Sequence, residues 1–220
     1  PEATLLDSLP WSNFFLAYQG GDDRDLQVRF AALIGDAIDA VAPQWRAPIA
    51  PRQRGGRRLR LGFASFFFRD GTAGRYFEHW ISDLDPARFE VVLYHLYPGT
   101  DVLFERLARR ADLVRHCPRW GPSRIAPVIR DDALDALIYT ELGMDATTFA
   151  LAALRLAPLQ CSAWGHPVTT GHSTIDVCFS SAAMEPADGD AHYSERLVRL
   201  PGIGTRYAQP RPPADATRSR

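Results

Sequence analysis

The sequence contains no lysine, so all 25 of its basic residues are arginine, set against 26 acidic residues. A genome rich in G and C would explain this bias, and so would a surface that grips phosphate or carboxylate with arginine forks. The net charge of -1 supplies no overall field that would recruit nucleic acid. We therefore expect no nucleic-acid partner. The arginines gathered within 52–60 are interpreted as a solvated basic flank, because no aromatic residues interleave them as an RNA contact would require.

Long apolar runs and a secretion signal are also missing. No window approaches the roughly 18 consecutive apolar residues of a membrane span, and the N-terminus lacks a basic-then-apolar pattern. The three cysteines, Cys117, Cys161 and Cys178, have spacings that match neither a metal site nor a CxxC motif. The sequence thus predicts a cytoplasmic protein without membrane contact or bound metal, whose cysteines are small buried hydrophobes in a reducing compartment.

Three motifs of common enzyme classes are absent as well. The chain has no Walker glycine loop, no GxSxG elbow and no GxGxxG fingerprint. ATPases, α/β-hydrolases and dinucleotide-dependent enzymes need these turns to hold phosphate, nucleophile or cofactor. We therefore predict no cofactor of these classes.

From residue 59 onward the chain alternates short apolar runs with helical segments. The apolar runs predict strands at 59–65, 89–96, 113–114, 134–140, 159–164 and 175–181. The helical segments between them lie at 74–84, 101–111, 123–130 and 146–156, and Asp145 is placed to cap the last of these. Near-continuous apolar strands separated by helices are typical of βαβ units, so the predicted fold class is α/β with a Rossmann-like parallel sheet.

The first 43 residues are predicted to be helical. Aromatic residues recur at helix spacing from Trp11 to Tyr18, and Asp22 or Asp23 is placed to cap a second helix. The apolar stripe of that helix comprises Leu26, Phe30, Leu33, Ile34, Ile38 and Val41. A stretch rich in proline, glycine and arginine follows and indicates a linker. We divide the chain into a helical segment and linker at 1–50, an α/β unit at 51–207 and a disordered tail at 208–220.

Ligands of open parallel sheets bind at the carboxyl ends of the strands, so the loops after the strands are the candidate sites. The richest loop follows the fifth predicted strand and holds His166 between Gly165 and Pro167, followed by Thr169 and Thr170. Histidine suits proton transfer near neutral pH, and threonine hydroxyls can bond a sugar or a phosphate. The alternative is a structural turn in which His166 bonds a backbone carbonyl.

Two other loops carry charged candidates. After the first predicted strand, Arg69 and Asp70 could orient a polar substrate or could simply pair with each other. After the fourth, Glu141 could bond hydroxyls or could be a solvated loop acid.

Two strings near the C-terminus are long and specific: LRLAPLQCSAWGHPVTTGHSTIDVCFSS at 154–181 and MEPADGDAHYSERLVRLPGIG at 184–204. Together with LRLGFASFFFRD, RFEVVLYHL and YTELGMD, they resemble the catalytic region of bacterial SPINDLY-like proteins, relatives of the O-linked N-acetylglucosamine transferases. The resemblance runs from 59 to 207, and the N-terminal helices resemble the segment that joins tetratricopeptide repeats to the catalytic region in that family.

The resemblance implies a GT-B architecture of two Rossmann-like lobes, of which this chain forms the first. Such enzymes move N-acetylglucosamine from UDP-GlcNAc to a Ser or Thr hydroxyl of an acceptor protein without a metal, and a related branch glycosylates Asn. On that basis we assign a catalytic role to His166. Substrate-binding roles are assigned to Arg69, Asp70, Glu141, Gly165, Pro167, Thr169 and Thr170.

Two features depart from the family pattern. Gly71 stands where many relatives carry a histidine just after the Arg-Asp pair, and glycine cannot accept a proton. The sequence also ends at Arg220, near the point where the donor-binding lobe is expected to begin. We therefore expect a UDP-sugar to bind only together with a second lobe. The alternative is a non-catalytic protein-interaction module derived from a truncated or degenerate glycosyltransferase.

Overall fold

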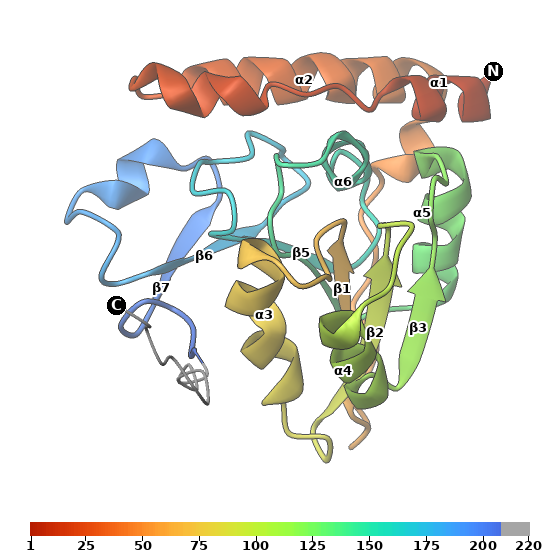
Figure 1. Ribbon diagram of the computed structural model, residues 1–220. Helices are drawn as coiled ribbons and strands as arrows, with labels where there is room; N and C mark the ends of the chain where they lie inside the picture. Colours follow the sequence, from red (N-terminus) through yellow and green to blue (C-terminus); the bar gives the residue numbers. More distant parts are fainter. Residues whose placement is uncertain (208–220) are drawn as a thin grey trace, which may run out of the picture.

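The computed structural model describes residues 1–207, so the tail predicted to be disordered at 208–220 lies outside the described residues. Seven parallel strands form one sheet in the order β3-β2-β1-β4-β5-β6-β7 (Figure 1). This confirms the α/β, Rossmann-like fold class. The strands are β1 (Leu59–Ser65), β2 (Phe89–His95), β3 (Leu113–His116), β4 (Ala136–Tyr139), β5 (Leu159–Ala163), β6 (Val177–Ser181) and β7 (Arg196–Leu200).

Helices cover the sheet on two faces and across one edge (Figure 1). The α-helices are α1 (Glu2–Ser8), α2 (Arg24–Val41), α3 (Thr72–Ser82), α4 (Val102–Arg110), α5 (Pro122–Asp131) and α6 (Ala146–Ala152). Three short 3-10 helices are η1 (Phe14–Gln19), η2 (Pro43–Trp45) and η3 (Gly189–His192). The N-terminal helices were predicted, except that the aromatic run winds as a 3-10 helix.

Neighbouring strand residues face opposite sides of the sheet and so enter different cores. Phe63 and Leu93 pack with the apolar side chains of α3 and α4. Ala64 and Val92, one position earlier or later, pack with those of α1, α2, α5 and α6. Successive side chains of a strand point to opposite faces of the sheet, and here both faces are covered. Nearly every residue of a central strand is therefore buried, which explains its near-continuous apolar sequence.

The N-terminal helices lie across the carboxyl ends of the strands (Figure 1). In α2 the residues that contact the rest of the protein form a narrower stripe than the sequence predicted. Leu26, Leu33 and Val41 are 50%, 55% and 49% exposed, while Ile34 and Ile38 are fully buried. The helix meets the lobe along one line, so apolar residues to either side of that line remain in solvent.

One close backbone approach fixes where α2 lies. Gly171, in the loop after β5, has a φ of +73°, and a Cβ placed there would lie 2.3 Å from the carbonyl oxygen of Gln27. The Gln27 side chain accepts a hydrogen bond of 2.7 Å from Asn13. A residue without a side chain is therefore required where the loop touches the helix backbone.

Other local predictions have mixed outcomes. Cys117, Cys161 and Cys178 are free and buried, as predicted. Asp145 caps α6 by accepting a hydrogen bond of 2.8 Å from the Thr148 backbone N–H. Strand β7 was not predicted, because its arginines break the apolar run by which the other strands were found.

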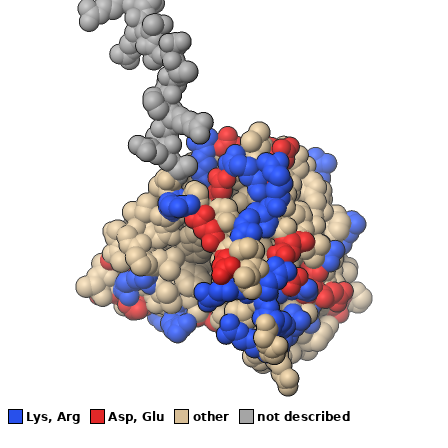
Figure 2. Space-filling view, turned by 90° about the horizontal axis from the view of Figure 1, so that it is seen from below, with Lys and Arg blue, Asp and Glu red and all other residues tan. Residues whose placement is uncertain are grey.

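Figure 2 views the opposite edge, at the amino ends of the strands, where arginines and acidic residues are interleaved. The cluster at 52–60 contributes three ion pairs, of 2.5 Å, 2.8 Å and 2.7 Å. They join Arg57 to Asp135, Arg58 to Asp112 and Arg60 to Glu90. These acids neutralise much of the local positive charge. Across 1–207, moreover, every helix is too short or too polar to cross a bilayer.

We predict that Gly171→Ala destabilises the protein by more than about 2 kcal/mol, because the added methyl group collides with backbone and the residue is held at a positive φ. Urea unfolding followed by circular dichroism measures the loss. Gly21→Ala is the matched control, since a Cβ at Gly21 meets nothing within 4 Å. Equal stability of the two variants would show that α2 does not rest on this loop.

Candidate functional site

The loop between β5 and β6 carries the richest group of predicted site residues. It leaves β5 through Gly165, whose N–H donates a hydrogen bond of 3.1 Å to the Thr140 carbonyl at the end of β4. A Cβ on Gly165 would lie 2.3 Å from that same oxygen. Glycine therefore lets the loop run against β4, and this close passage sets the position of the next residue, His166.

The His166 ring is held by packing and not by hydrogen bonds. It is 7% exposed and is stacked on the Phe14 ring at a centroid distance of 5.2 Å. On another side it meets Gly143, where a Cβ would lie 2.5 Å from Cδ2 of the imidazole. The structural-turn alternative requires a hydrogen bond from the ring to a backbone carbonyl, but within 1–207 neither ring nitrogen of His166 forms a hydrogen bond with a protein group.

The electrostatic setting of His166 favours a neutral imidazole. Burial lowers the pKa of His166, and the negative charge of Asp23 opposes that shift. A neutral imidazole with a free nitrogen is the form that can accept a proton. His166 therefore has the charge state and the unused hydrogen-bonding capacity of a general base.

Thr169 and Thr170 are anchored to one buried carboxylate. The Thr169 hydroxyl donates a hydrogen bond of 2.6 Å to Glu195, and the Thr170 backbone N–H donates another of 2.8 Å. The Thr170 hydroxyl donates to the same group. Both hydroxyls predicted to bond a substrate are thus used within the protein. The sequence analysis did not identify Glu195, because nothing in the residues around it indicates a contact with Thr169 and Thr170.

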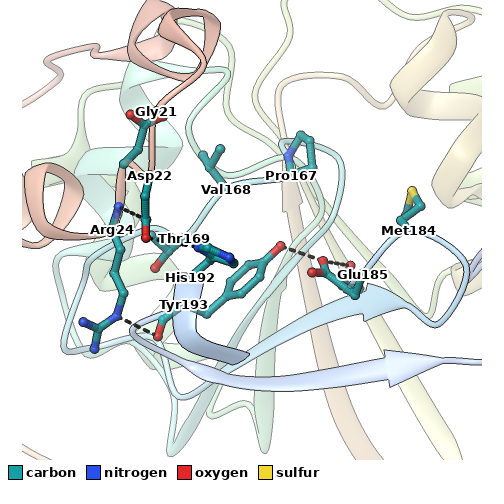
Figure 3. Close-up of a pocket in the computed structure, with 12 residues that line it drawn as sticks. Gly21, Asp22, Arg24, Pro167, Val168, Thr169, Met184, Glu185, His192 and Tyr193 are labelled. Carbon is teal, nitrogen blue, oxygen red and sulfur yellow. Dashed lines mark hydrogen bonds and ion pairs between the residues drawn. The ribbon is translucent and has the colours of Figure 1, made fainter. Parts of the chain in front are cut away.

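A cavity of about 260 Å³ opens between this loop and the start of α2 (Figure 3). His166 does not itself line the cavity, but Asp23 does, and the charge of Asp23 acts on His166. Of the predicted site residues, Pro167 and Thr169 line it. The other lining residues are Gly21, Asp22, Asp23, Arg24, Val168, Ser180, Met184, Glu185, His192 and Tyr193.

Glu141 is buried beside the same loops. It is 1% exposed and accepts hydrogen bonds from the Ser65 hydroxyl at 2.8 Å, the Phe66 N–H at 3.3 Å and the Thr140 hydroxyl. The alternative of a solvated loop acid is therefore wrong. Burial raises the pKa of Glu141 to about 7, against the three donors, which lower it.

Arg69 and Asp70 do not pair with each other, contrary to the alternative considered from the sequence. The Asp70 carboxylate accepts a hydrogen bond of 2.7 Å from Arg75. The Arg69 guanidinium lies 4.7 Å from the centroid of the Tyr97 ring. Neither residue lines the cavity beside His166. Among residues 1–207, no group of three or more His, Cys, Asp or Glu side chains is arranged to hold a metal ion.

The pKa of Glu141 is raised from its usual value of 4.5 to about 7 in the folded protein. We predict that Glu141 therefore makes the protein less stable as pH rises through this range. In that window the folded state keeps a proton that the unfolded chain has released, so the free energy of unfolding falls by up to about 3 kcal/mol. Glu141→Gln removes this fall, and Glu105→Gln, on the exposed surface of α4, does not. Urea unfolding at a series of pH values compares them. Parallel profiles of wild type and Glu141→Gln would contradict the prediction.

We compared the chain with protein families and with known proteins. No family model matches the chain. It is 29% identical over 193 residues to a probable UDP-N-acetylglucosamine–peptide N-acetylglucosaminyltransferase SPINDLY of Eustoma exaltatum subsp. russellianum, covering 83% of this chain. It is 26% identical over 149 residues to the corresponding protein of Oryza sativa subsp. japonica, covering 66% of this chain.

A solved structure also matches. A mutant of Thermobaculum terrenum O-GlcNAc transferase superposes with a TM-score of 0.66 at 28% identity, covering 80% of this chain and 34% of that one. The chain spans only 20% and 16% of the length of the two SPINDLY proteins. Over the matched segment the chain is therefore similar, in sequence and in fold, to the SPINDLY-like and O-linked N-acetylglucosamine transferases.

Proposed function

We propose that the described residues form the acceptor-side lobe of a protein O-glycosyltransferase that uses UDP-GlcNAc, with His166 as the general base. The observation that carries the proposal is the imidazole itself. It is buried, favours its neutral form and leaves both nitrogens without a protein partner, at the carboxyl edge of a parallel sheet. His172, in the same loop, also lacks partners at both ring nitrogens, but these atoms are fully enclosed and burial lowers the pKa of His172 to about 3. The ring nitrogens of His166 are not among the enclosed unpartnered atoms, so a substrate hydroxyl can reach them.

In the proposed reaction, a Ser or Thr hydroxyl of the acceptor attacks the anomeric carbon of the sugar. The new C–O bond forms as the bond to the UDP oxygen breaks, and the hydroxyl proton passes to His166. The departing diphosphate carries the electron pair of the broken bond and needs positive groups around it. The cavity beside His166 holds Asp22, Asp23 and Glu185, so it does not suit that leaving group. We therefore assign the diphosphate to a second lobe.

The other predicted site residues take supporting roles in this proposal. Gly165 and Pro167 shape the turn that presents His166, and the bonds from Thr169 and Thr170 to Glu195 hold that turn in place. Glu141 ties the loop after β4 to the loop after β1. Arg69 and Asp70 extend the substrate surface along the same edge.

The wider setting of the enzyme is also part of the proposal. The acceptor is a protein, and tetratricopeptide repeats precede this segment in the parent chain. The three free, buried cysteines fit the reducing environment of the cytoplasm. We retain the division into 1–50 and 51–207, although Ile34 and Ile38 of the first part enter the same core as the second.

One observation favours the non-catalytic alternative, an interaction module. Gly71, at the loop after β1, has no side chain to offer, and a Cβ there would meet nothing within 4 Å. The position is therefore open enough for the histidine that many relatives carry. A second proton acceptor is missing there, so the catalytic proposal depends on His166.

We predict that His166→Ala lowers kcat by about a hundred-fold or more, because the hydroxyl proton loses its acceptor. The assay uses a protein in which this segment is joined to a donor-binding lobe, with UDP-GlcNAc and a serine-containing peptide. His79→Ala, on α3, is the control and should keep wild-type turnover. Circular dichroism verifies that both variants fold. Full activity of His166→Ala would show that the loop is structural.

We predict that residues 1–207 alone bind no UDP in an isothermal titration at millimolar nucleotide, because the carboxylates of the cavity repel a diphosphate. The same segment joined to a donor-binding lobe should bind it. Saturable binding by the isolated segment would place the donor site here and overturn the division of roles.

A further inference from the structure

Asp23 is a buried carboxylate without a protein partner. It is 9% exposed and lines the cavity beside the His166 loop. Although it stands at the N-cap position of α2, its side chain makes no capping hydrogen bond. The capping geometry predicted from the sequence is instead adopted by Asp22, which accepts a bond of 3.1 Å from the Arg24 N–H. The oxygens of Asp23 are therefore unused.

The other acids of the cavity are already satisfied. Asp22 lies 3.1 Å from the His192 ring nitrogen. Glu185 accepts hydrogen bonds from the Ser180 hydroxyl at 2.5 Å and the Tyr193 hydroxyl at 2.7 Å (Figure 3). Asp23 is thus the lining carboxylate that has no partner within the described residues.

The positive groups nearby do not serve Asp23. Arg24 donates from Nε to the Tyr193 carbonyl at 3.1 Å, as Figure 3 shows. Its Nη1 lies 3.8 Å from Asp25, on the outer side of the helix start. His192 is engaged by Asp22. The oxygens of Asp23 are not among the fully enclosed polar atoms without partners, so they remain accessible from the cavity. The fold gives them no donor or cation, so a ligand that brings both can form a charge-assisted hydrogen bond with Asp23.

The size of the cavity limits what that ligand can be. A volume of about 260 Å³ is below the range of roughly 300–1,000 Å³ typical of sites that enclose a whole small molecule. It suits one long side chain. Pro167, the residue after His166, lines the same cavity as Asp23, so a side chain bound to Asp23 lies close to the loop that carries the proposed base.

We propose that this cavity is a specificity subsite that receives an arginine or lysine side chain of the acceptor peptide, with Asp23 as its partner. The inference rests on the proposed function, because it takes the occupant to be part of the acceptor. It adds a sequence preference: the target hydroxyl reaches His166 when a basic residue stands close to it in the acceptor. An acidic residue at the same place is rejected by Asp23 and Glu185.

The test is a titration of the 220-residue chain followed by NMR, with the peptide acetyl-Gly-Ser-Gly-Arg-Gly-amide. Two matched peptides carry citrulline, which has the shape of arginine without its charge, or glutamate. We expect the arginine peptide to shift the signals of Thr169 and Tyr193 and to bind at least ten-fold more tightly than either control peptide.

Two variants locate the binding. Asp23→Asn keeps the shape of the side chain and should weaken binding of the arginine peptide at least ten-fold. Asp25→Asn, two positions along the chain and 84% exposed at its side chain, should leave it unchanged. Equal binding of the citrulline peptide, undiminished binding to Asp23→Asn, or no binding of the arginine peptide would each overturn the inference. The peptide series on the unaltered chain decides the matter even if Asp23→Asn folds poorly.

This binding experiment involves no sugar transfer, so its outcome is separate from that of the activity assay. Loss of the subsite with intact dependence of turnover on His166 would leave the proposed function standing. Binding of the arginine peptide together with full activity of His166→Ala would leave a peptide-binding surface without the proposed chemistry.

Discussion

The site depends on the hydrogen bonds that the buried Glu195 carboxylate accepts from the loop between β5 and β6. That loop has no regular secondary structure to hold it, yet Thr169, Thr170 and His172 within it are all buried. Backbone and hydroxyl groups in such a place need partners, and one carboxylate supplies three of them. Because Glu195 directly precedes β7, the loop is fastened to the sheet. The position of His166 follows from that anchor and from the passage of Gly165 against β4.

The second constraint comes from the N-terminal segment, which reaches the same loop at three points. Gly171 touches the backbone of α2 at Gln27, Phe14 covers one face of His166, and Asp23 enters the neighbouring cavity. Composition alone marks this segment as a helical linker, because a proline- and arginine-rich stretch separates it from the strands. Its contacts make it one wall of the site. The imidazole owes its low exposure, and therefore its lowered pKa, in part to a residue 152 positions earlier in the chain.

The sequence predicted those features that depend on residues close together in the chain. The apolar runs of β1 and β2 and the cap at Asp145 depend on residues within a few positions of one another. The features that depend on distant partners were not predicted. Glu195 accepts a hydrogen bond from Thr169, which lies 26 positions earlier, and no periodic pattern in the sequence indicates a contact over that separation. Arg69 and Asp70 are neighbours in a loop, but Arg69 turns to the Tyr97 ring and Asp70 to Arg75. Strand β7 has arginine at positions where a buried strand would be apolar, since it lies at the edge of the sheet.

The distribution of charge along the carboxyl edge supports a division of labour between two lobes. At the β5–β6 side, the cavity holds three carboxylates against Arg24 and His192, and both of these are engaged by protein groups. Sugar transfer requires positive charge beside the departing diphosphate and a neutral base beside the attacking hydroxyl. The residues of one small cavity cannot provide both environments. The proposed function puts the acceptor at the β5–β6 end of the edge. Within 1–207, the Arg69 guanidinium after β1 forms no ion pair with an acid and lies over the Tyr97 ring. Under the proposed function, the acceptor hydroxyl lies at the acidic end of the edge, and the departing anion lies away from it, toward the second lobe.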